Sequence, residues 1–573
     1  MLYCVRRLWP VAIFVVLAGI HLAVGKLPCA GDETRYAFQG VGLYTNGSFY
    51  PDRAVWKRFA DSSGCGNGGV LQSDHRGRPL QTISASVIYG AALRVAGLEG
   101  ARWLNFAVGC VGLTLLYVLL WSLFPRRTGG PSAAAIVSFA AIALSLPFVP
   151  YLQLIYPEVL LFTAVAAALY GLTRRRYYLT LVAIVLLPFL HVRALPLSLI
   201  FFLVLLVQMR RDKTAIAIRW QFLALYAAGM AIFAASQYRL FGSLTGSAFP
   251  SYAPSLSIAL ERIGMQLYGV RHGAVAYAPL LLVGFAGLLL GTLRRERVCE
   301  YSLILFGTYF ATFMWSNASE SWTARFWVAG LPFLAVGLGF WLNQAKRWWE
   351  WLPAAPLAAI DIGNTLTYIF NPLWYLESRQ ASIPYAALFL IAHVHFGLLL
   401  PVDGEPGGIA PYAAPIAPLL AYTALLIALL VMCRVPSVTR SRILFTAAAC
   451  ALLTLPVAFA AANSVDATDY SVTVDPKQHE FVVRLNAPRQ NVDAIQFDDQ
   501  IPAFWQAPPY PRSFTIRCIR DGRVVSETDE PAHPLLILPR CVDPTSIEIE
   551  GNAGSQDATY RGFGRMRLIR RLL

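Results

Sequence analysis

Two adjacent carboxylic acids, Asp32 and Glu33, stand a few positions after an apolar segment at residues 8–25. Ionised carboxylates gain nothing from burial in lipid, so a pair just beyond a membrane-spanning segment is placed to reach the water-facing end of a membrane-bound substrate. A carboxylate in that place can act as a general base toward a hydroxyl group. The alternative is local, because acidic residues favour helix N-termini and Thr34 could assist a cap. The doublet alone supports both interpretations equally.

The chain has the composition of a polytopic membrane protein. Of its 573 residues, 57% are hydrophobic and only 14% are charged, and the mean hydropathy is +0.53. A soluble protein of this length carries more charge, whereas a spanning helix needs about 20 mostly apolar residues. The sequence predicts a mainly α bundle of about 13 spans, at residues 8–25, 103–124, 131–149, 157–173, 178–192, 194–209, 220–238, 274–293, 300–316, 326–343, 351–370, 411–433 and 443–462.

Basic residues predict the orientation of this bundle. Arginine and lysine gather at every second junction between spans, and cytoplasmic loops concentrate these residues. A cytoplasmic N-terminus therefore places every basic cluster inside. The net charge of +15 is then a topology signal and not a nucleic-acid surface, because it is scattered over short loops. Residues 383–402 are apolar enough to span, but a span there would put Arg434 outside, so the segment is predicted to be external.

The composition changes after residue 462. The runs 470–474, 480–485, 513–518 and 546–550 alternate in hydrophobicity or are β-branched, with turn residues between them. This pattern is typical of short antiparallel strands, and about 110 residues suffice for a small β-sandwich with its own core. The expected organisation is a membrane domain over 1–462, with a first external loop at 26–102, and an external β-rich domain over 463–573.

The cysteine positions agree with this topology. The chain has nine cysteines, and the four that are predicted to be external are Cys29, Cys65, Cys518 and Cys541. An even external set predicts an oxidising compartment and two disulfides. The simplest pairing joins Cys29 to Cys65 and Cys518 to Cys541. His393 and His395 have no third ligand at a zinc-like spacing, so they predict no zinc site.

The first external loop contains a second charged feature. Arg78 precedes residues 81–97, where apolar side chains recur at helix-like intervals, as in a helix that lies in the membrane interface. A permanently charged guanidinium level with lipid headgroups suits a phosphate. Its alternative role is a snorkelling anchor. Residues 64–69 match a dinucleotide-binding glycine pattern, but neither a strand nor a helix flanks them, so no nucleotide site is predicted.

Several segments together resemble a known superfamily. They are, in chain order, Gly31-Asp32-Glu33 with Tyr36, Arg78-Pro79-Leu80, Arg102, Tyr156-Pro157-Glu158, residues 268–280 with Arg271 and His272, and residues 315–326 ending in Arg325-Phe326. Their order and sidedness are similar to those of the GT-C superfamily of polytopic glycosyltransferases, in particular the protein O-mannosyltransferase and lipid A aminoarabinose transferase group. The resemblance covers about residues 1–345.

The resemblance implies an inverting transfer of a hexose or pentose from a polyprenyl-phosphate donor to a lipid, glycan or protein acceptor outside the membrane. Asp32 is then the candidate general base, with Glu33 orienting the acceptor or tuning Asp32 by like-charge coupling. The expected ligands of the donor phosphate are Arg78 first, then Arg271, His272 and Arg325. Candidates for the cavity wall are Tyr36, Tyr156, Glu158, His191 and Arg193.

The same group is generally considered metal-independent, so no metal and no cofactor are expected, although two adjacent carboxylates are ligands of a kind that divalent cations accept. The expected location is a bacterial inner membrane, with the site facing the periplasm. A transporter or flippase of a lipid-linked saccharide is the alternative. That class often shows inverted repeats and charges at mid-membrane, but here no repeat is evident and the charges gather in external loops. The sugar and the acceptor stay open.

Overall fold

The computed structural model describes most of the chain up to residue 451 and the strands that follow. The described ranges are 9–25, 32–63, 83–125, 132–242, 273–315, 325–345, 347–370, 416–434 and 443–451, the strands after residue 463, and single positions or short pieces between these, including Cys29 and Cys65. The predicted ligands Arg78, Arg271 and His272, and the segment 383–402, lie outside the described residues. The chain divides into two compact units, and the second contains residues 452–573.

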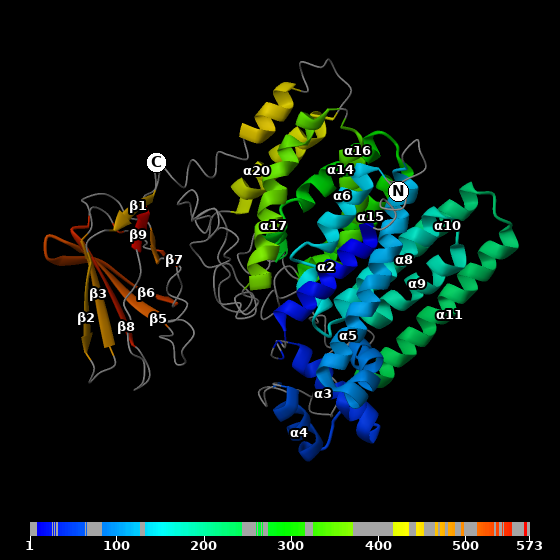
Figure 1. Cartoon of the computed structure of the whole chain (residues 1–573), viewed down its shortest axis with the longest axis horizontal. Helices are drawn as coiled ribbons and strands as arrows, with labels where there is room; N and C mark the ends of the chain where they lie inside the picture. The colour runs from blue at the N-terminus through cyan, green and yellow to red at the C-terminus, as the bar shows by residue number, and fades with distance from the viewer. Residues whose placement is uncertain are drawn as a thin grey trace. The chain divides into compact units, whose positions relative to one another are not determined.

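The first unit is helical (Figure 1). Its described elements are α2 (Trp9–Val24), α3 (Glu33–Asn46), α4 (Arg53–Ser63), α5 (Ser84–Leu123), α6 (Ala133–Ala143), α7 (Val149–Leu152), α8 (Pro157–Thr173), α9 (Tyr177–Leu190), η1 (Val192–Ala194), α10 (Leu195–Arg211), α11 (Ile216–Phe241), α13 (Ala274–Tyr277), α14 (Leu281–Leu293), α15 (Arg297–Ala311), η3 (Thr312–Trp315), η4 (Arg325–Gly330), α16 (Leu331–Asn343), η5 (Trp348–Ala354), α17 (Ala355–Phe370) and α20 (Ile416–Met432). A helix is present at each predicted span.

The lengths of these helices confirm an apolar helical fold but not the number of spans. Among the described residues, four helices are long and apolar enough to cross a membrane, at 84–123, 192–211, 216–241 and 325–343. Other predicted spans are formed by apolar helices of 10–17 residues. The apolar helices support an integral membrane protein, and the figure of about 13 spans stays a prediction.

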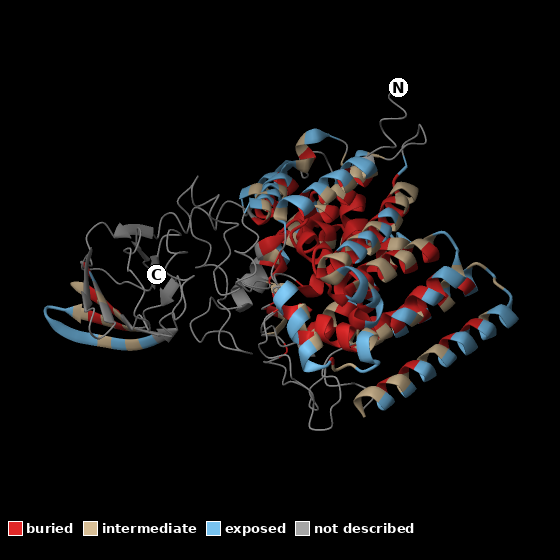
Figure 2. Ribbon diagram, turned by 60° about the horizontal axis from the view of Figure 1, so that its bottom comes forward, coloured by how far each residue is buried: buried red, intermediate tan, exposed pale blue. Residues whose placement is uncertain are grey.

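Burial separates the helices of this unit into inner and outer ones (Figure 2). In the helix at 325–343, 94% of the most apolar window is buried, whereas in α11 the corresponding share is 17%. A helix that is apolar on all sides is buried in protein or faces lipid. We therefore read the helix at 325–343 as the centre of the bundle and α11 as a helix whose exposed apolar side chains, such as Trp220 and Ile232, face lipid.

At the junctions predicted to be cytoplasmic, ion pairs and hydrogen bonds connect the ends of neighbouring helices. Arg175, after α8, lies 3.3 Å from a carboxylate oxygen of Asp212, after α10. At the end of α14, Arg294 donates a 2.6 Å hydrogen bond to the backbone carbonyl of Arg434, which follows α20. The Arg434 side chain is buried and pairs with Glu350 at 3.1 Å. These junctions were expected on one side of the membrane, and their contacts agree with that expectation.

Labelling of introduced cysteines in intact cells tests this sidedness. Ser48, between α3 and α4, and Lys213, between α10 and α11, are both exposed. We expect a membrane-impermeant maleimide to label Ser48→Cys from outside and to label Lys213→Cys only after the cells are opened, each compared with the unmodified chain. Protection of Ser48→Cys, or labelling of Lys213→Cys in intact cells, would contradict the orientation.

The described helices of the loop predicted to be external, α3 and α4, pack as a small layer on α5. Helices α3 and α4 lie side by side at one end of the helical unit (Figure 1), and the Tyr44 hydroxyl donates to the Val87 carbonyl at 2.8 Å. A disulfide joins Cys29 to Cys65, which confirms that predicted pair. The predicted interfacial helix and the second span follow each other directly within α5, and non-helical backbone at Gly97 marks the kink between them. Gly97 has φ +66°, a left-handed conformation that glycine adopts without steric cost.

The second unit is a β domain of two antiparallel sheets. Its strands are β1 (Ser464–Ala467), β2 (Tyr470–Asp475), β3 (Glu480–Asn486), β4 (Ala494–Phe497), β5 (Ser513–Arg520), β6 (Arg523–Pro531), β7 (Leu535–Ile537), β8 (Ser546–Asn552) and β9 (Met566–Ile569). The sheet orders are β1-β9-β4-β7 and β2-β3-β8-β5-β6. All four predicted strands form, as β2, β3, β8 and β5, and they are consecutive neighbours in the second sheet.

The buried residues of the five-stranded sheet explain its register. Leu485, Ile516 and Ile547 are buried. Leu485 on β3 pairs with Ile547 on β8, and Ile547 in turn pairs with Cys518 on β5. Because side chains alternate between the two faces of a strand, this register places the apolar positions on one face. Cys518 is bonded to Cys541, which confirms the second predicted disulfide.

Candidate functional site

Asp32 stands at the N-cap position of α3, but its side chain caps no backbone N–H. Its Oδ2 accepts a 2.5 Å hydrogen bond from Arg325 Nη1, and its Oδ1 accepts one of 3.1 Å from Arg35 Nη1. The side chain is 24% exposed. Asp32 thus stands at a helix N-terminus, as the local interpretation expects, and its carboxylate in addition faces two guanidinium groups.

Arg325 is the centre around which the predicted site residues gather. It lies in η4, is buried, and donates through Nε to Glu158 Oε1 at 2.5 Å. Its Nη2 donates to the Tyr36 hydroxyl at 3.3 Å, and its Cζ lies 4.6 Å from the centre of the Tyr156 ring. Together with Asp32, these residues come from three distant parts of the chain. The structure thus brings together Asp32, Tyr36, Tyr156, Glu158 and Arg325, which were named from sequence alone.

The contacts of Arg325 bear on its predicted role as a ligand of the donor phosphate. Two carboxylates, those of Asp32 and Glu158, already hold its guanidinium. A guanidinium neutralised on two edges has little capacity left for a phosphate. In this arrangement Arg325 instead positions the two acids, which makes it a positioning residue for the candidate base.

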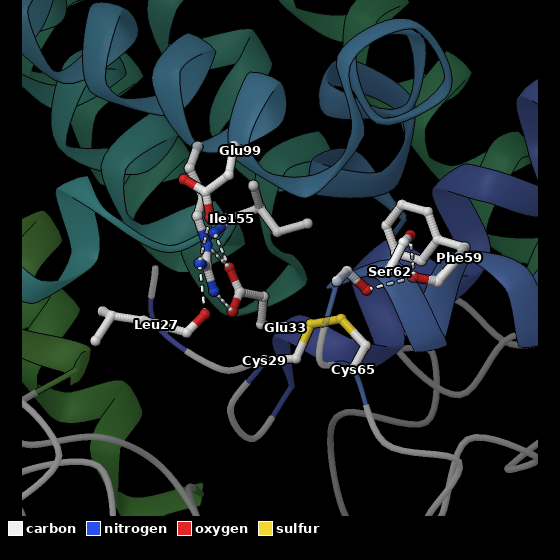
Figure 3. The surroundings of a disulfide bond; sticks show 10 residues. Leu27, Cys29, Glu33, Phe59, Ser62, Cys65, Glu99 and Ile155 are labelled. Atoms are coloured by element: carbon white, nitrogen blue, oxygen red, sulfur yellow. Dashed lines mark hydrogen bonds and ion pairs between the residues drawn. A yellow bond between two sulfur atoms is a disulfide. The ribbon is translucent and has the colours of Figure 1, made fainter. Parts of the chain in front are cut away.

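Glu33 binds a different arginine from Asp32, and Figure 3 shows its carboxylate beside Ile155 and Glu99. Its two carboxylate oxygens accept hydrogen bonds from Arg102, one from Nε at 3.1 Å and one from Nη2 at 2.7 Å. Oε1 also accepts the backbone N–H of Ile155 at 3.1 Å. Arg102 donates further to the Leu27 carbonyl at 2.7 Å and to Glu99 at 3.0 Å. The expectation that Glu33 touches the acceptor or tunes Asp32 has no support in this geometry.

The reason for this difference is helix geometry. Neighbouring positions on a helix point about 100° apart and do not face each other. Asp32 turns toward η4, and Glu33 turns toward α5 and the connection before α8. Glu33 therefore ties the first turn of α3 to two other elements, close to the disulfide of Cys29 and Cys65 in Figure 3. We assign it a positioning role.

Buried tyrosines form an apolar side of the site. The ring of Tyr156 lies 5.8 Å from that of Tyr36 and 5.6 Å from that of Tyr151, both edge-on. Burial raises the pKa of Tyr36, and the neighbouring carboxylates of Asp32 and Glu158 raise it further against the opposing effect of Arg325. Burial likewise raises the pKa of Tyr156 well above its ordinary value. Both phenols stay protonated near neutral pH, so they can form hydrogen bonds but cannot serve as bases.

His191 and Arg193 also lie beside the site, as predicted. His191 is the N-cap of the turn η1 between α9 and α10, and Arg193 lies within this turn, where His191 Nδ1 accepts the backbone N–H of Arg193 at 3.1 Å. The Arg193 Cζ lies 4.0 Å from the centre of the Phe326 ring, and Phe326 directly follows Arg325 in the chain. The turn thus places a second arginine next to the Arg325 cluster.

Sequence reasoning missed two partners. Arg35 stands three positions after Asp32, a spacing at which helical side chains meet, and this spacing was the available signal. Asn105 was not named at all. Its amide donates to the carbonyls of Tyr151, Leu152 and Leu154 and so fixes the turn before Tyr156. Nothing in its local sequence distinguishes Asn105, because its partners lie some 50 positions away.

The described residues contain no group of three or more histidine, cysteine, aspartate or glutamate side chains that could hold a metal ion. Asp32 and Glu33 bind different arginines.

Comparison with known proteins returned similarity to solved structures only. ArnT from Cupriavidus metallidurans in the apo state is 14% identical, with a TM-score of 0.40, 78% of this chain and 74% of that chain being covered. The same protein bound to undecaprenyl phosphate has a TM-score of 0.38 at 14% identity, with 78% and 76% covered. The arabinosyltransferase EmbB from Mycobacterium smegmatis has a TM-score of 0.39 at 13% identity, with 98% and 64% covered.

These structures are GT-C proteins. No protein-family description and no curated protein matches the chain.

Proposed function

We propose that this chain is a membrane glycosyltransferase that moves a sugar from a polyprenyl-phosphate donor to an acceptor hydroxyl on the external side. The observation that carries the proposal is the accessibility of Asp32. The two carboxylates that hold Arg325 differ in exposure, because Glu158 is 2% exposed and Asp32 is 24% exposed, and Glu33, next to Asp32 in the chain, is 0% exposed. Asp32 is the acid of these three that a substrate can reach.

The chemistry follows from this placement. The acceptor oxygen attacks the anomeric carbon, and Asp32 takes the hydroxyl proton as the new carbon–oxygen bond forms. The bond between the anomeric carbon and the phosphate oxygen breaks, and its electron pair leaves with the polyprenyl phosphate. Attack from the side opposite the leaving phosphate inverts the anomeric configuration. Because the leaving phosphate is a weak base, this step needs positive charge near the phosphate more than it needs a strong acid.

The contacts around Asp32 fix the position of its carboxylate. Arg35 and Arg325 hold its two oxygens in fixed directions, and the Glu33–Arg102 pair fixes the helix turn that carries it. Reactive groups that are pre-positioned in this way account for a large part of enzymatic rate enhancement. Arg78, Arg271 and His272, outside the described residues, remain proposed ligands of the donor phosphate.

Transfer of a labelled sugar tests the proposal. The purified protein is incubated with polyprenyl-phosphate sugars carrying a radiolabel and with an extract of its native membrane as the acceptor source. We expect label to leave the lipid and enter an acceptor fraction, and we expect no use of nucleotide sugars. If none of the added lipid-linked sugars loses its sugar under these conditions, the protein is not a transferase of this class. Retention of lipid binding in that case would favour a flippase.

A further inference from the structure

The ion pairs of the site leave one arginine out. Arg102 is held by Glu33 and Glu99, and Arg325 is held by Asp32 and Glu158. Among the residues that the structure describes, no carboxylate lies within 4.0 Å of the Arg193 guanidinium. Arg193 therefore brings a positive charge to the site without a contacting counter-charge.

The fold nevertheless holds Arg193 in one place. Its backbone N–H is bound by His191, and the residues on either side of it, Val192 and Ala194, are buried. The guanidinium lies over the Phe326 ring, where stacking fixes its plane but uses none of its five N–H donors. The side chain is half-buried and so is accessible from outside the core. A guanidinium that is fixed by stacking and has free donors is ready to bind a planar or tetrahedral anion.

The surroundings place this charge within the proposed active site. The electrostatic interactions of Arg193 involve Tyr309, Arg325, Glu158 and Tyr36. The Arg325 Cζ lies 5.7 Å from the same Phe326 ring that Arg193 covers. Arg193 shares the Phe326 ring with Arg325, and Arg325 in turn binds the candidate base Asp32.

We propose that Arg193 binds the phosphate group of the lipid-linked donor, and that Arg325 positions the acids instead of contacting this phosphate. The inference rests on the proposed function, because a phosphate-linked lipid must be a substrate. Arg193 would hold the donor phosphate before transfer and stabilise the negative charge that this phosphate gains as the sugar leaves.

Binding of lipids with and without a phosphate tests the role of Arg193. Affinities for polyprenyl phosphate and for the polyprenol of the same length are measured by native mass spectrometry of the full chain. For Arg193→Gln we expect polyprenyl phosphate to bind about tenfold to a hundredfold more weakly, as for the loss of a charge-assisted hydrogen bond. Polyprenol affinity should not change. Arg193→Lys should show a smaller loss, because the charge stays and the fork is lost.

A matched control is Arg58→Gln, which removes an exposed arginine of α4 in the same external layer. It should bind both lipids as the unmodified chain does.

If the stack of Arg193 on Phe326 had a purely structural role, Arg193→Gln would have a lower thermal unfolding midpoint and would bind both lipids more weakly to the same degree. That result would overturn the inference. If Arg193→Gln does not fold, Arg193→Lys decides, and an unchanged preference for phosphate in that variant also overturns it.

The outcomes separate the inference from the proposed function. If the unmodified protein does not prefer polyprenyl phosphate to polyprenol, the proposed function fails. If it does prefer the phosphate and Arg193→Gln keeps the full preference, the proposed function stands and the assignment of Arg193 is wrong.

Discussion

Replacing Asp32 with asparagine is expected to slow sugar transfer in a single turnover by about 10²–10⁴-fold, the usual contribution of a general base. Asparagine has the size of aspartate, and its amide oxygen can still accept a hydrogen bond from Arg325. Glu158 continues to hold the other edge of Arg325. The geometry of the site should therefore persist, and what is lost is the group that takes the proton of the acceptor hydroxyl.

The rate and the donor affinity should respond differently to this change. Asp32 contacts arginines that also bind other groups, and in the proposed mechanism it meets the acceptor and not the donor phosphate. We expect polyprenyl-phosphate binding by Asp32→Asn to stay close to that of the unmodified chain. The measurement pairs a lipid-binding assay with a single-turnover rate at saturating donor, so that a loss of chemistry is not mistaken for a loss of binding.

The matched control is Asp61→Asn. Asp61 lies on α4 in the same external layer and is exposed. Removing its charge changes the local electrostatics of the layer without touching the Arg325 cluster, so turnover should be unaffected. Should Asp32→Asn turn over as fast as Asp61→Asn, the assignment of Asp32 as the base is wrong.

The sequence predicted the elements of the fold well, because their signals are local. Apolar length identified the helices, and alternation identified the strands β2, β3, β5 and β8. The even set of external cysteines identified both disulfides. Each of these inferences needs only a short window of sequence and one physical rule.

Breaks inside the predicted spans were not foreseen, because distant residues stabilise them. The span at 131–149 is interrupted between α6 and α7, and the span at 274–293 between α13 and α14. At the first break Thr365 donates to the Leu144 carbonyl at 2.6 Å, and at the second Asn364 donates to the Tyr277 carbonyl at 2.9 Å. Interrupted helices at membrane depth are tolerated where side chains satisfy the freed backbone groups. Both of these hydrogen-bond donors come from one helix, α17. A short stretch of sequence around either break gives no sign of this contact.

Five residues that gather around Arg325 or include it were named from the sequence, but the pairing between them was not predicted. The residues around Arg325 were named together because their motifs share an order and a side of the membrane. Which acid binds which arginine depends on packing between α3, α5 and η4. The spacing rule for helices, which sends Asp32 and Glu33 in different directions, was the one available hint.

Breaking the pair of Glu33 and Arg102 is expected to cause a large loss of stability. Both side chains are buried, at 0% and 2% exposure, and removing one partner of a buried pair leaves a charge without compensation. Such changes typically cost about 3–5 kcal/mol. We expect Glu33→Gln to lose this much in unfolding free energy, measured by denaturant titration in detergent micelles, and to lose transfer activity with it.

Glu99→Gln is the matched control, because Glu99 binds the same arginine at 3.0 Å but is 38% exposed. An exposed ion pair contributes about 0–1 kcal/mol, so this variant should unfold close to the unmodified chain. Both variants exchange the same functional group on the same guanidinium. A difference between them therefore reports the burial of Glu33 and its additional hydrogen bonds to Arg102 and Ile155.

The double variant Glu33→Gln with Arg102→Met distinguishes a positioning role from direct contact with the acceptor. Replacing both members of a buried pair by uncharged side chains is often close to neutral, since no buried charge is left unpaired. If Glu33 only positions the first turn of α3, the double variant should recover much of the stability lost by Glu33→Gln and part of the turnover, because Asp32 then returns to its place beside Arg325. A Glu33→Gln protein that is as stable as the unmodified chain but inactive would show that Glu33 acts on the substrate. The buried pairing with Arg102 would then have to open during the reaction.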